Sequence, residues 1–131
     1  GYGISVDELV EEIAKDAVFF EESGGGVTFS GGDPLYFPKE FRALSQQIKK
    51  ATGLNIWCYT GFTLEQLTGK IQSRATGETA REMLKCIDIL VDGKFEKELK
   101  NITLKFRGSE NQRVIDMKKT LESGKITLYL E

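Results

Sequence analysis

Hydrophobic positions along the chain alternate between helical spacing and short, mostly apolar runs. Near the amino end, Ser5 and Glu8 match a capping box, and apolar residues then recur at helical spacing from Val6 to Ala17. The first stop signal after this stripe is Ser23-Gly24. We therefore predict one helix that begins near Ser5 and ends at Ser23-Gly24.

The rest of the chain largely repeats an order of strand followed by helix. Strands are predicted where β-branched and aromatic residues cluster between turn signals, and helices where apolar residues recur every three or four positions. In chain order the first predicted elements are a strand at 27–30, a helix from Pro38 to its Gly53 cap and a strand at 54–59. A third helix begins with a capping box of Thr63 and Gln66 and runs to Ile71; after a break near Gly77 it resumes and runs through Leu84. The last predicted elements are strands at 87–91 and 113–116, a short helix at 117–122 and a strand at 125–130.

This alternation predicts an α/β fold of repeated βα units in a single domain, residues 1–131. Such units form a parallel sheet or part of a parallel barrel. With 131 residues the chain is too short for a complete eight-stranded barrel, which takes about 250 residues. We therefore expect a parallel sheet or an incomplete parallel (β/α) barrel, with any ligand at the carboxyl ends of the strands.

The charge balance narrows the function classes. The chain has 18 Lys and Arg against 20 Asp and Glu, a net charge of −2, and so lacks the basic excess that a nucleic-acid surface needs. No apolar run approaches the roughly 18 residues of a membrane span, and no signal peptide opens the chain. We expect a cytoplasmic protein that binds neither nucleic acid nor membrane.

Two absences limit the chemistry further. The chain has no histidine, which removes the commonest general base and metal ligand. Its two cysteines, Cys58 and Cys86, are 28 positions apart, so this chain alone cannot assemble a zinc site or an iron–sulfur cluster. Both lie in or beside apolar stretches, and we expect each to be a buried small hydrophobe.

Gly31-Gly32-Asp33 follows the strand at 27–30 and therefore lies at the predicted ligand end. Two glycines let a ligand approach the backbone, but the Lys-Ser/Thr of a P-loop does not follow, and Asp33 would repel a phosphate. A cationic or amine-bearing ligand suits this element. The alternative is a tight turn, stopped by Asp33-Pro34, that binds nothing.

The other strand ends also carry polar groups toward this rim. They are Thr60, Asp92-Gly93-Lys94, and a polar loop that contains Arg107, Asn111 and Arg113. Each alone is an ordinary turn or a solvated charge. Together they predict a shared ligand, since two carboxylates and a hydroxyl suit an ammonium group and a ribose diol.

Four blocks of the sequence closely resemble the anaerobic ribonucleoside-triphosphate reductase activating proteins, which are small radical S-adenosylmethionine enzymes. The blocks are VTFSGGDPL at 27–35, WCYTGF at 57–62, LVDGKF at 90–95 and FRGSENQR at 106–113. The first block is shared with the pyruvate formate-lyase activating enzyme and with many radical S-adenosylmethionine proteins. The other three, in this order, point to the reductase activases. The resemblance spans essentially the whole chain and implies a partial barrel of the radical S-adenosylmethionine type.

The resemblance implies a definite chemistry and a set of site residues. In the family, a [4Fe–4S] cluster held by three cysteines in a C-x-x-x-C-x-x-C loop reduces S-adenosylmethionine, and the resulting radical removes hydrogen from a glycine of a partner enzyme. Gly31, Gly32 and Asp33 match the element that receives the methionyl amine, although Asp33 replaces the commoner glutamate. The remaining implied cofactor residues are Thr60, near the ribose, with Asp92 and Lys94.

The same resemblance implies two protein partners. One is the reductase or another glycyl-radical enzyme, and the other is a reduced flavodoxin-type or ferredoxin-type electron donor. We expect the polar loop from Arg107 to Arg113, including Asn111, to recognise the glycyl-radical partner, because it lies beside the strand ends where a partner glycine must enter. A solvated loop without a partner is the alternative.

The cysteine loop of the family has no counterpart in these 131 residues. In the family this loop follows the first strand, ahead of the helix that begins here at Ser5. We expect an N-terminally truncated activase that lacks its first strand and its cluster ligands, and is inactive alone. The alternatives are a non-catalytic adaptor that binds S-adenosylmethionine or the reductase, and an activase for another enzyme such as pyruvate formate-lyase.

Overall fold

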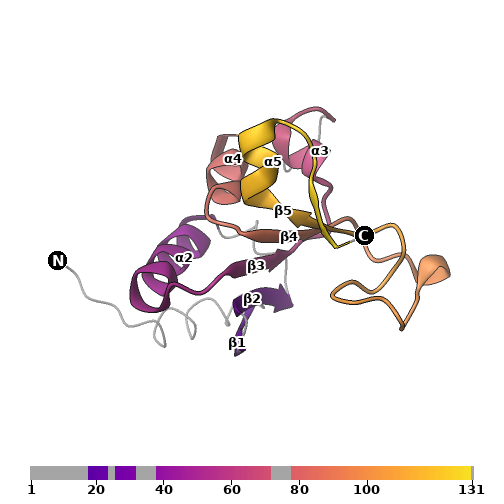
Figure 1. The fold of residues 1–131 in the computed structure, drawn as a ribbon, viewed down its shortest axis with the longest axis horizontal. Coiled ribbons are helices and arrows are strands. Elements are labelled where there is room, and N and C mark those ends of the chain that lie inside the picture. The colour runs from indigo at the N-terminus through magenta and orange to yellow at the C-terminus, as the bar shows by residue number, and fades with distance from the viewer. Residues whose placement is uncertain (1–17, 24–25, 32–37, 72–77, 131) are drawn as a thin grey trace.

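The computed structural model describes residues 18–23, 26–31, 38–71 and 78–130, which form a mixed α/β fold around one six-stranded sheet (Figure 1). The strands are β1 (Val18–Ser23), β2 (Gly26–Gly31), β3 (Ile56–Tyr59), β4 (Ile89–Asp92), β5 (Arg113–Asp116) and β6 (Leu128–Leu130). The helices are α2 (Pro38–Thr52), α3 (Leu64–Thr68), α4 (Glu78–Leu84), α5 (Met117–Ser123) and the short 3₁₀ helix η2 (Lys97–Leu99).

The strands lie in sequence order, but the sheet is only partly parallel. Strands β2, β3 and β4 are parallel, as predicted, with α2, α3 and α4 in the connections between them. The expectation of parallel strands is wrong for β5, which runs antiparallel to β4, and β6 runs antiparallel to β5. A parallel pair needs a long crossover, usually helical, whereas residues 93–112 turn back at the same edge of the sheet with only the single turn of η2.

The amino-terminal prediction is wrong where the structure can test it. Residues 18–23, assigned to the end of a helix, form β1 and pair antiparallel with β2, with Ser23 opposite Gly26. The predicted helix start at Ser5 lies outside the described residues. Val18, Phe19 and Phe20 favour a strand, and Gly24-Gly25 between two such runs is a typical hairpin signal. Pairing with β2 therefore outweighs the helical spacing of the preceding residues.

Several predicted boundaries shift by a few residues. The third helix ends at Thr68 rather than near Ile71, because Gly69 takes a left-handed conformation with φ of 94° and caps it. Strand β3 begins at Ile56 instead of residue 54, and β6 at Leu128 instead of residue 125. The predicted start of α2 at Pro38 is confirmed.

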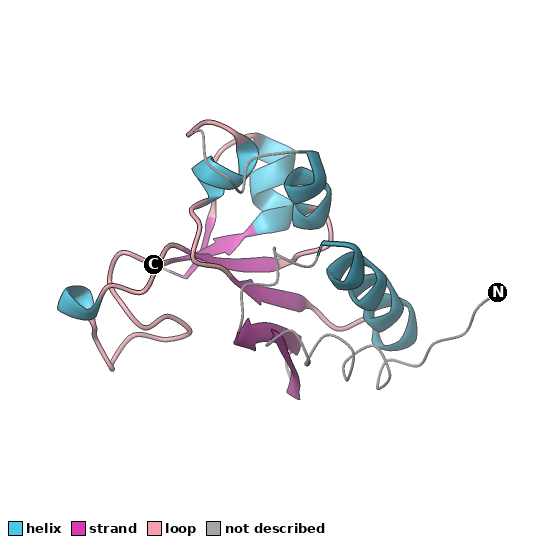
Figure 2. Ribbon diagram, turned by 180° about the vertical axis from the view of Figure 1, so that it is seen from behind, coloured by secondary structure: helices cyan, strands magenta, loops and turns pink. Residues whose placement is uncertain are grey.

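The four α-helices of the described ranges pack on one face of the sheet (Figures 1 and 2). The core on this face includes Leu44 of α2, Leu67 of α3, Met83 of α4 and Met117 of α5, all almost fully buried in one cluster with Leu90 of β4. Because these side chains are buried together, the helices are fixed against this face of the sheet. Among the helices of the described ranges, none combines the length and hydrophobicity needed to cross a bilayer.

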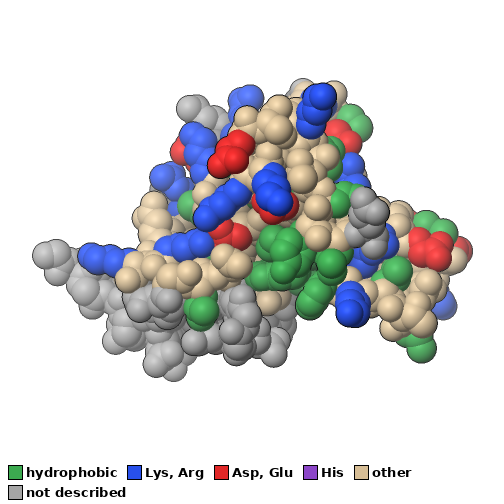
Figure 3. Space-filling model, in the orientation of Figure 1, with side chains coloured by type: hydrophobic (Ala, Val, Ile, Leu, Met, Phe, Trp, Pro, Cys, Tyr) green, Lys and Arg blue, Asp and Glu red, His purple; other side chains and the backbone are tan. Residues whose placement is uncertain are grey.

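The opposite face of the sheet carries a smaller hydrophobic cluster. Ile89, Val91 and Val114 are its buried members, and Trp57 and Tyr59 pack against them while remaining partly exposed. Figure 3 shows hydrophobic side chains gathered near the middle of one view of the molecule, below the position of α5 in Figure 1. The two clusters alternate along β3, β4 and β5, as the two faces of a sheet require.

Candidate functional site

The parallel strands end in a single row at one edge of the sheet. In the observed register, β2, β3 and β4 are aligned and Asp92 lies opposite Arg113 of β5. Continued to the ends of the strands, this register aligns Gly31, Thr60, Asp92 and Arg113. Four of the predicted site positions are therefore brought together from strands that are distant in the sequence.

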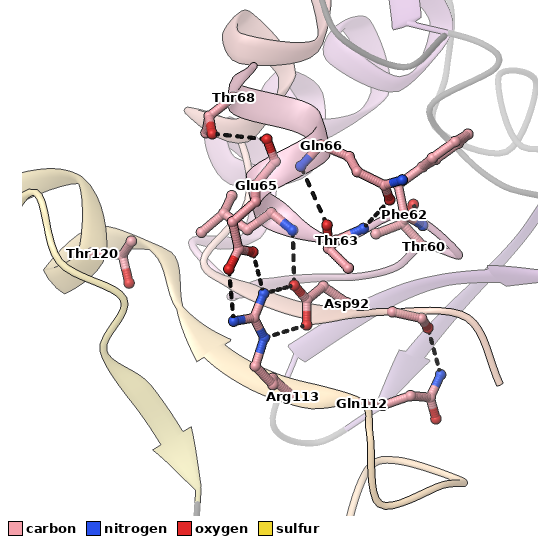
Figure 4. Close-up of polar contacts among 12 residues, drawn as sticks. Thr60, Phe62, Thr63, Glu65, Gln66, Thr68, Asp92, Gln112, Arg113 and Thr120 are labelled. Atoms are coloured by element: carbon pink, nitrogen blue, oxygen red, sulfur yellow. Dashed lines mark hydrogen bonds and ion pairs between the residues drawn. The ribbon is translucent and has the colours of Figure 1, made fainter. Parts of the chain in front are cut away.

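Asp92 is held by an ion-pair cluster at the centre of this row. Its side chain is fully buried, and Arg113 binds both carboxylate oxygens, with Nε donating to Oδ1 at 3.0 Å and Nη2 donating to Oδ2 (Figure 4). Arg113 also bonds Glu65 of α3, with Nη2 donating to Oε1 at 2.6 Å. The hydrogen bond from Arg113 lowers the pKa of Glu65, and the bonds to Asp92 are the main reason that the pKa of Arg113 is raised. Glu65 and Arg113 therefore both stay charged near neutral pH.

The start of α3 is fixed to the same cluster. The backbone N–H of Leu64 donates to Asp92 Oδ2 at 2.8 Å. The predicted capping box is confirmed, with Gln66 N donating to the Thr63 hydroxyl and Thr63 N donating to Gln66 Oε1. Asp92 therefore ties the carboxyl end of β4 to the first turn of the helix above it.

Thr60 is buried directly after β3. Its backbone N–H donates to Val91 O at 3.1 Å, and its hydroxyl oxygen accepts from Phe62 N at 3.1 Å. These bonds shape the turn between β3 and α3 (Figure 4). Thr60 thus lies at the predicted rim, with its hydroxyl engaged in the turn.

An open hollow of about 640 Å³ adjoins these residues. Its volume falls within the roughly 300–1,000 Å³ of small-molecule sites. Its lining combines two turns, the start of α3 and the loop before β5; the lining residues are Gly61, Phe62, Thr63, Glu65, Gln66, Ile71, Asp92, Gly93, Lys94, Glu96, Asn111 and Arg113. Lys94 is exposed at this hollow, so its ammonium group is accessible to a ligand.

The loop from Gly93 to Gln112 is held by its own side chains. Arg107 Nη1 donates to Glu110 O at 3.0 Å and to Gln112 O at 2.6 Å, and Asn111 Nδ2 donates to Lys94 O at 2.8 Å. The three residues predicted to bind a partner, Arg107, Asn111 and Arg113, therefore all make bonds within the chain in this structure.

The structure also identifies residues that the sequence analysis missed. Glu65 supplies the second carboxylate bound by Arg113, and Gln112 is a buried hydrogen-bonding residue of the loop. In the sequence, Glu65 is only an acidic residue in the first turn of a predicted helix. No local pattern indicates that it bonds Arg113, which lies 48 positions later. Gly32 and Asp33 lie outside the described residues, so their predicted roles stay predictions.

The cysteines do not provide a set of cluster ligands. Cys58 is fully buried in the core, as predicted, and Cys86 is half-buried, with burial raising the pKa of its thiol. A [4Fe–4S] cluster takes its protein ligands from cysteine thiolates, of which these 131 residues contain two. Within the described ranges, no group of three His, Cys, Asp or Glu side chains is arranged to hold a metal ion. These residues therefore do not fit the cluster.

Comparison with known proteins gives a consistent family. Residues 2–115 match the family described as a 4Fe-4S single cluster domain. The chain is 33% identical over 115 residues to the anaerobic ribonucleoside-triphosphate reductase-activating protein of Pasteurella multocida, covering 84% of this chain and 68% of that protein. It is 37% identical over 110 residues to the protein of the same name from Salmonella typhi, covering 82% of this chain and 66% of that protein.

A third relative has a different name. The benzylsuccinate synthase activating enzyme of Thauera aromatica is 35% identical over 91 residues, which cover 70% of this chain and 24% of that protein. No solved structure matches the chain. The match over residues 2–115 and the 33% identity across two thirds of a curated relative show that the chain belongs to the 4Fe-4S single cluster domain family and, within it, to the anaerobic ribonucleoside-triphosphate reductase-activating proteins.

Proposed function

We propose that this chain forms the part of a glycyl-radical enzyme activase that binds S-adenosylmethionine and the partner, folded as part of an incomplete (β/α) barrel of the radical S-adenosylmethionine type. The observation that carries the proposal is the row of polar strand ends beside the 640 Å³ hollow. When bound, S-adenosylmethionine supplies the radical chemistry, so the absence of histidine is no obstacle.

The residues of the row have separate roles in this proposal. Gly31, Gly32 and Asp33 receive the methionyl amine, and Thr60 shapes the turn beside the ribose. Lys94, which is exposed at the hollow, contacts the ligand directly. Both carboxylate oxygens of Asp92 are already bonded, to Arg113 and to Leu64 N. We therefore assign Asp92 two indirect roles: it positions the turn that carries Lys94, and it supplies negative charge near a bound ammonium or sulfonium group.

The cluster belongs to a part of the activase that these residues do not supply. We propose that its thiolates come from a cysteine loop outside this sequence, since Cys58 is enclosed in the core. Reading the coding sequence upstream of Gly1 tests this directly. Three cysteines spaced C-x-x-x-C-x-x-C support an activase, and their absence supports a non-catalytic adaptor that binds S-adenosylmethionine or the reductase.

The partner surface is proposed to be the loop between β4 and β5. Four of its large apolar side chains are exposed, namely Phe95, Leu99, Ile102 and Phe106, with Ile102 88% accessible. Exposed apolar side chains gathered on one loop suit a protein partner. Arg107 and Asn111 support this surface by holding the loop in shape.

We propose anaerobic ribonucleoside-triphosphate reductase as the glycyl-radical partner, because several relatives are named as its activating proteins. The relative named for benzylsuccinate synthase supports a second candidate, an activase for another glycyl-radical enzyme. A reduced flavodoxin-type or ferredoxin-type protein is the proposed electron donor, on the family resemblance.

The experiment uses full-length protein, anaerobically reconstituted and mixed with each candidate partner. The doublet of a glycyl radical in the electron paramagnetic resonance spectrum reports activation, and release of 5′-deoxyadenosine without partner reports cleavage of S-adenosylmethionine. Ile102→Asp should lower the radical yield and leave cleavage intact. Leu121→Asp, which places the same charge at an exposed position on α5, is the matched control and should change neither.

The outcomes separate the proposals. A radical in the reductase alone supports the first candidate, and a radical only in another glycyl-radical enzyme supports the second. Protein that binds S-adenosylmethionine but neither cleaves it nor activates a partner is the adaptor. Equal radical yields from Ile102→Asp and Leu121→Asp would contradict the assignment of the loop as the docking surface.

A further inference from the structure

Two short segments beside the hollow face each other residue by residue. The turn Asp92-Gly93-Lys94 continues from β4, and the triplet Asn111-Gln112-Arg113 leads into β5 in the opposite direction. Each side chain of the triplet bonds the turn residue opposite it. The bonds are Arg113 Nε to Asp92 Oδ1 at 3.0 Å, Gln112 Nε2 to Gly93 O at 2.9 Å and Asn111 Nδ2 to Lys94 O at 2.8 Å.

These side-chain bonds begin where backbone pairing stops. The β4–β5 ladder ends at the pair of Asp92 and Arg113. Gly93 has a φ of +93°, which takes the chain out of strand geometry, so the ladder does not continue past it. Two side-chain amides then bind the carbonyl groups of Gly93 and Lys94 in place of backbone N–H groups. The turn is thus held at every residue.

Gln112 joins the turn to the partner loop. Its side chain is largely buried, and its Oε1 accepts from Gly108 N at 2.9 Å and Ser109 N at 3.2 Å while its Nε2 donates to Gly93 O. The oxygen of this amide therefore holds the loop, and its nitrogen holds the turn. This division allows the two roles to be separated by a single substitution.

We propose that Asn111, Gln112 and Arg113 are positioning residues that set the turn Asp92-Gly93-Lys94 against the bound ligand. The proposal rests on the proposed function, in which Lys94 contacts S-adenosylmethionine. It also changes the role expected for Asn111 and Arg113 from partner contact to placement of the cofactor-binding turn. Because Gln112 spans both segments, a shift of the partner loop reaches the turn through one side chain.

The decisive variant is Gln112→Glu, which keeps an oxygen for Gly108 and Ser109 and replaces the nitrogen that donates to Gly93 O. Gln46→Glu, an exposed residue on α2 at the other end of the sheet, is its matched control. Asn111→Ala, at an exposed position, gives a second variant if Gln112→Glu fails to fold. Asn101→Ala, in the same loop but not bonded to the turn, is the control for it.

Two measurements are made on full-length protein. Amide hydrogen exchange at Gly93, whose N–H bonds Phe62 O at 2.9 Å, reports whether the turn is held, with Leu90 in β4 as the internal reference. Calorimetric titration with S-adenosylmethionine, without reductant, reports binding. We expect Gln112→Glu and Asn111→Ala each to speed exchange at Gly93 and weaken binding by about tenfold, the value of one hydrogen bond. The two controls should change each quantity less than about twofold.

Every outcome decides a part of the proposal. Unchanged exchange at Gly93 in both variants overturns the claim that these side chains hold the turn. Faster exchange with unchanged affinity overturns the claim that the turn faces the ligand. If the wild-type protein does not bind S-adenosylmethionine, the proposed function fails instead, and the exchange measurement still decides whether the triplet holds the turn.

Discussion

Two buried aspartates lie at opposite ends of β4 and are held in different ways. Asp88 precedes the strand and Asp92 ends it; each accepts a backbone N–H, from Ile56 at 2.7 Å and from Leu64 at 2.8 Å respectively. Asp88 pairs with Lys49 and with Lys118, whose ammonium group lies 3.6 Å away on a side chain that is 73% exposed. Asp92 is paired instead with the less exposed, planar guanidinium of Arg113.

The difference shows how the partner of a buried carboxylate sets what the carboxylate can do. Lysine ammonium groups on flexible stems neutralise Asp88 without fixing a geometry. The guanidinium of Arg113 fixes both oxygens of Asp92 and reaches a third element through Glu65. Both aspartates line an open hollow, and at the Asp92 end the cation also orders the turn that lines it.

The largest predicted difference is in stability. Arg113→Ala leaves Asp92 fully buried without its cation, which costs about 3–5 kcal/mol of unfolding free energy. Lys118→Ala removes an exposed cation from Asp88 and costs less than about 1 kcal/mol. Urea unfolding followed by circular dichroism measures both. Similar losses in the two variants would mean that the two ends of β4 are not distinguished by their cations.

The second prediction compares ligand binding at the two ends of the sheet, the end that carries Asp92 and the end that carries Asp88. Asp33→Ala in full-length protein should weaken binding of S-adenosylmethionine by roughly ten- to hundredfold, because it removes a charge-assisted hydrogen bond worth about 1.5–3 kcal/mol. Asp88→Ala, at the opposite end of the sheet, should weaken it less. Calorimetry measures both affinities, and circular dichroism checks that each variant is folded. Equal affinities would reject the assignment of the ligand to the end that carries Asp92.

A third, smaller difference concerns two glycines with positive φ. Gly93→Ala should cost about 2 kcal/mol and Gly53→Ala about 1 kcal/mol, since the left-handed region is unfavourable for alanine. The φ of +93° at Gly93 lies farther from the ordinary left-handed well than the +69° of Gly53. A Cβ at Gly93 would make ordinary contacts at 3.7 Å with Asn111 and Gln112, and a Cβ at Gly53 would meet nothing within 4 Å, so neither variant clashes and φ sets the difference. Thermal unfolding gives the order, and a larger loss at Gly53 would contradict it.

The smallest effect is a pH dependence at the Asp92 end. Arg113 lowers the pKa of Glu65 below its usual 4.5, so the pair contributes fully above pH 4.5 and its contribution is lost as the pH falls toward the folded pKa. Glu65→Gln should therefore lower stability at pH 6 by about 0.5–1 kcal/mol and lower it less at pH 3.5. Urea unfolding at the two pH values checks the sign. A loss that grows on acidification would indicate that Glu65 does not depend on Arg113.

Local signals predicted the elements better than their pairing. The Pro38 start, the Gly53 cap and the box of Thr63 and Gln66 involve neighbours in the sequence and were all recovered. The direction of β5 was not, because it depends on how residues 93–112 return to the sheet. The strand at 18–23 was missed because its partner, β2, outweighs a helical pattern that precedes it.

The sequence predicted which residues lie near one another at the candidate site, but it did not predict the bonds between their side chains. The rule that ligands lie at the carboxyl ends of parallel strands selected Thr60, Asp92 and Lys94 correctly as neighbours of one edge. It did not show that the Arg113 side chain bonds Asp92 and Glu65, because an arginine next to a loop is equally consistent with a side chain in solvent. Only the fold brings these three charges within hydrogen-bond distance.

The aromatic contacts of the loop have a consequence for observing the molecule. Trp57 is the only tryptophan of the chain, and its ring centroid lies 4.9 Å from Phe106 and 5.6 Å from Tyr129. Phe106 has a φ of 67°, unusual for a residue with a side chain, and its carbonyl accepts a 2.6 Å hydrogen bond from the Tyr59 hydroxyl. If the loop lifts away, the indole loses its cover on that side. Intrinsic fluorescence excited at the tryptophan band would then shift to the red, reporting movement of the loop without any added label.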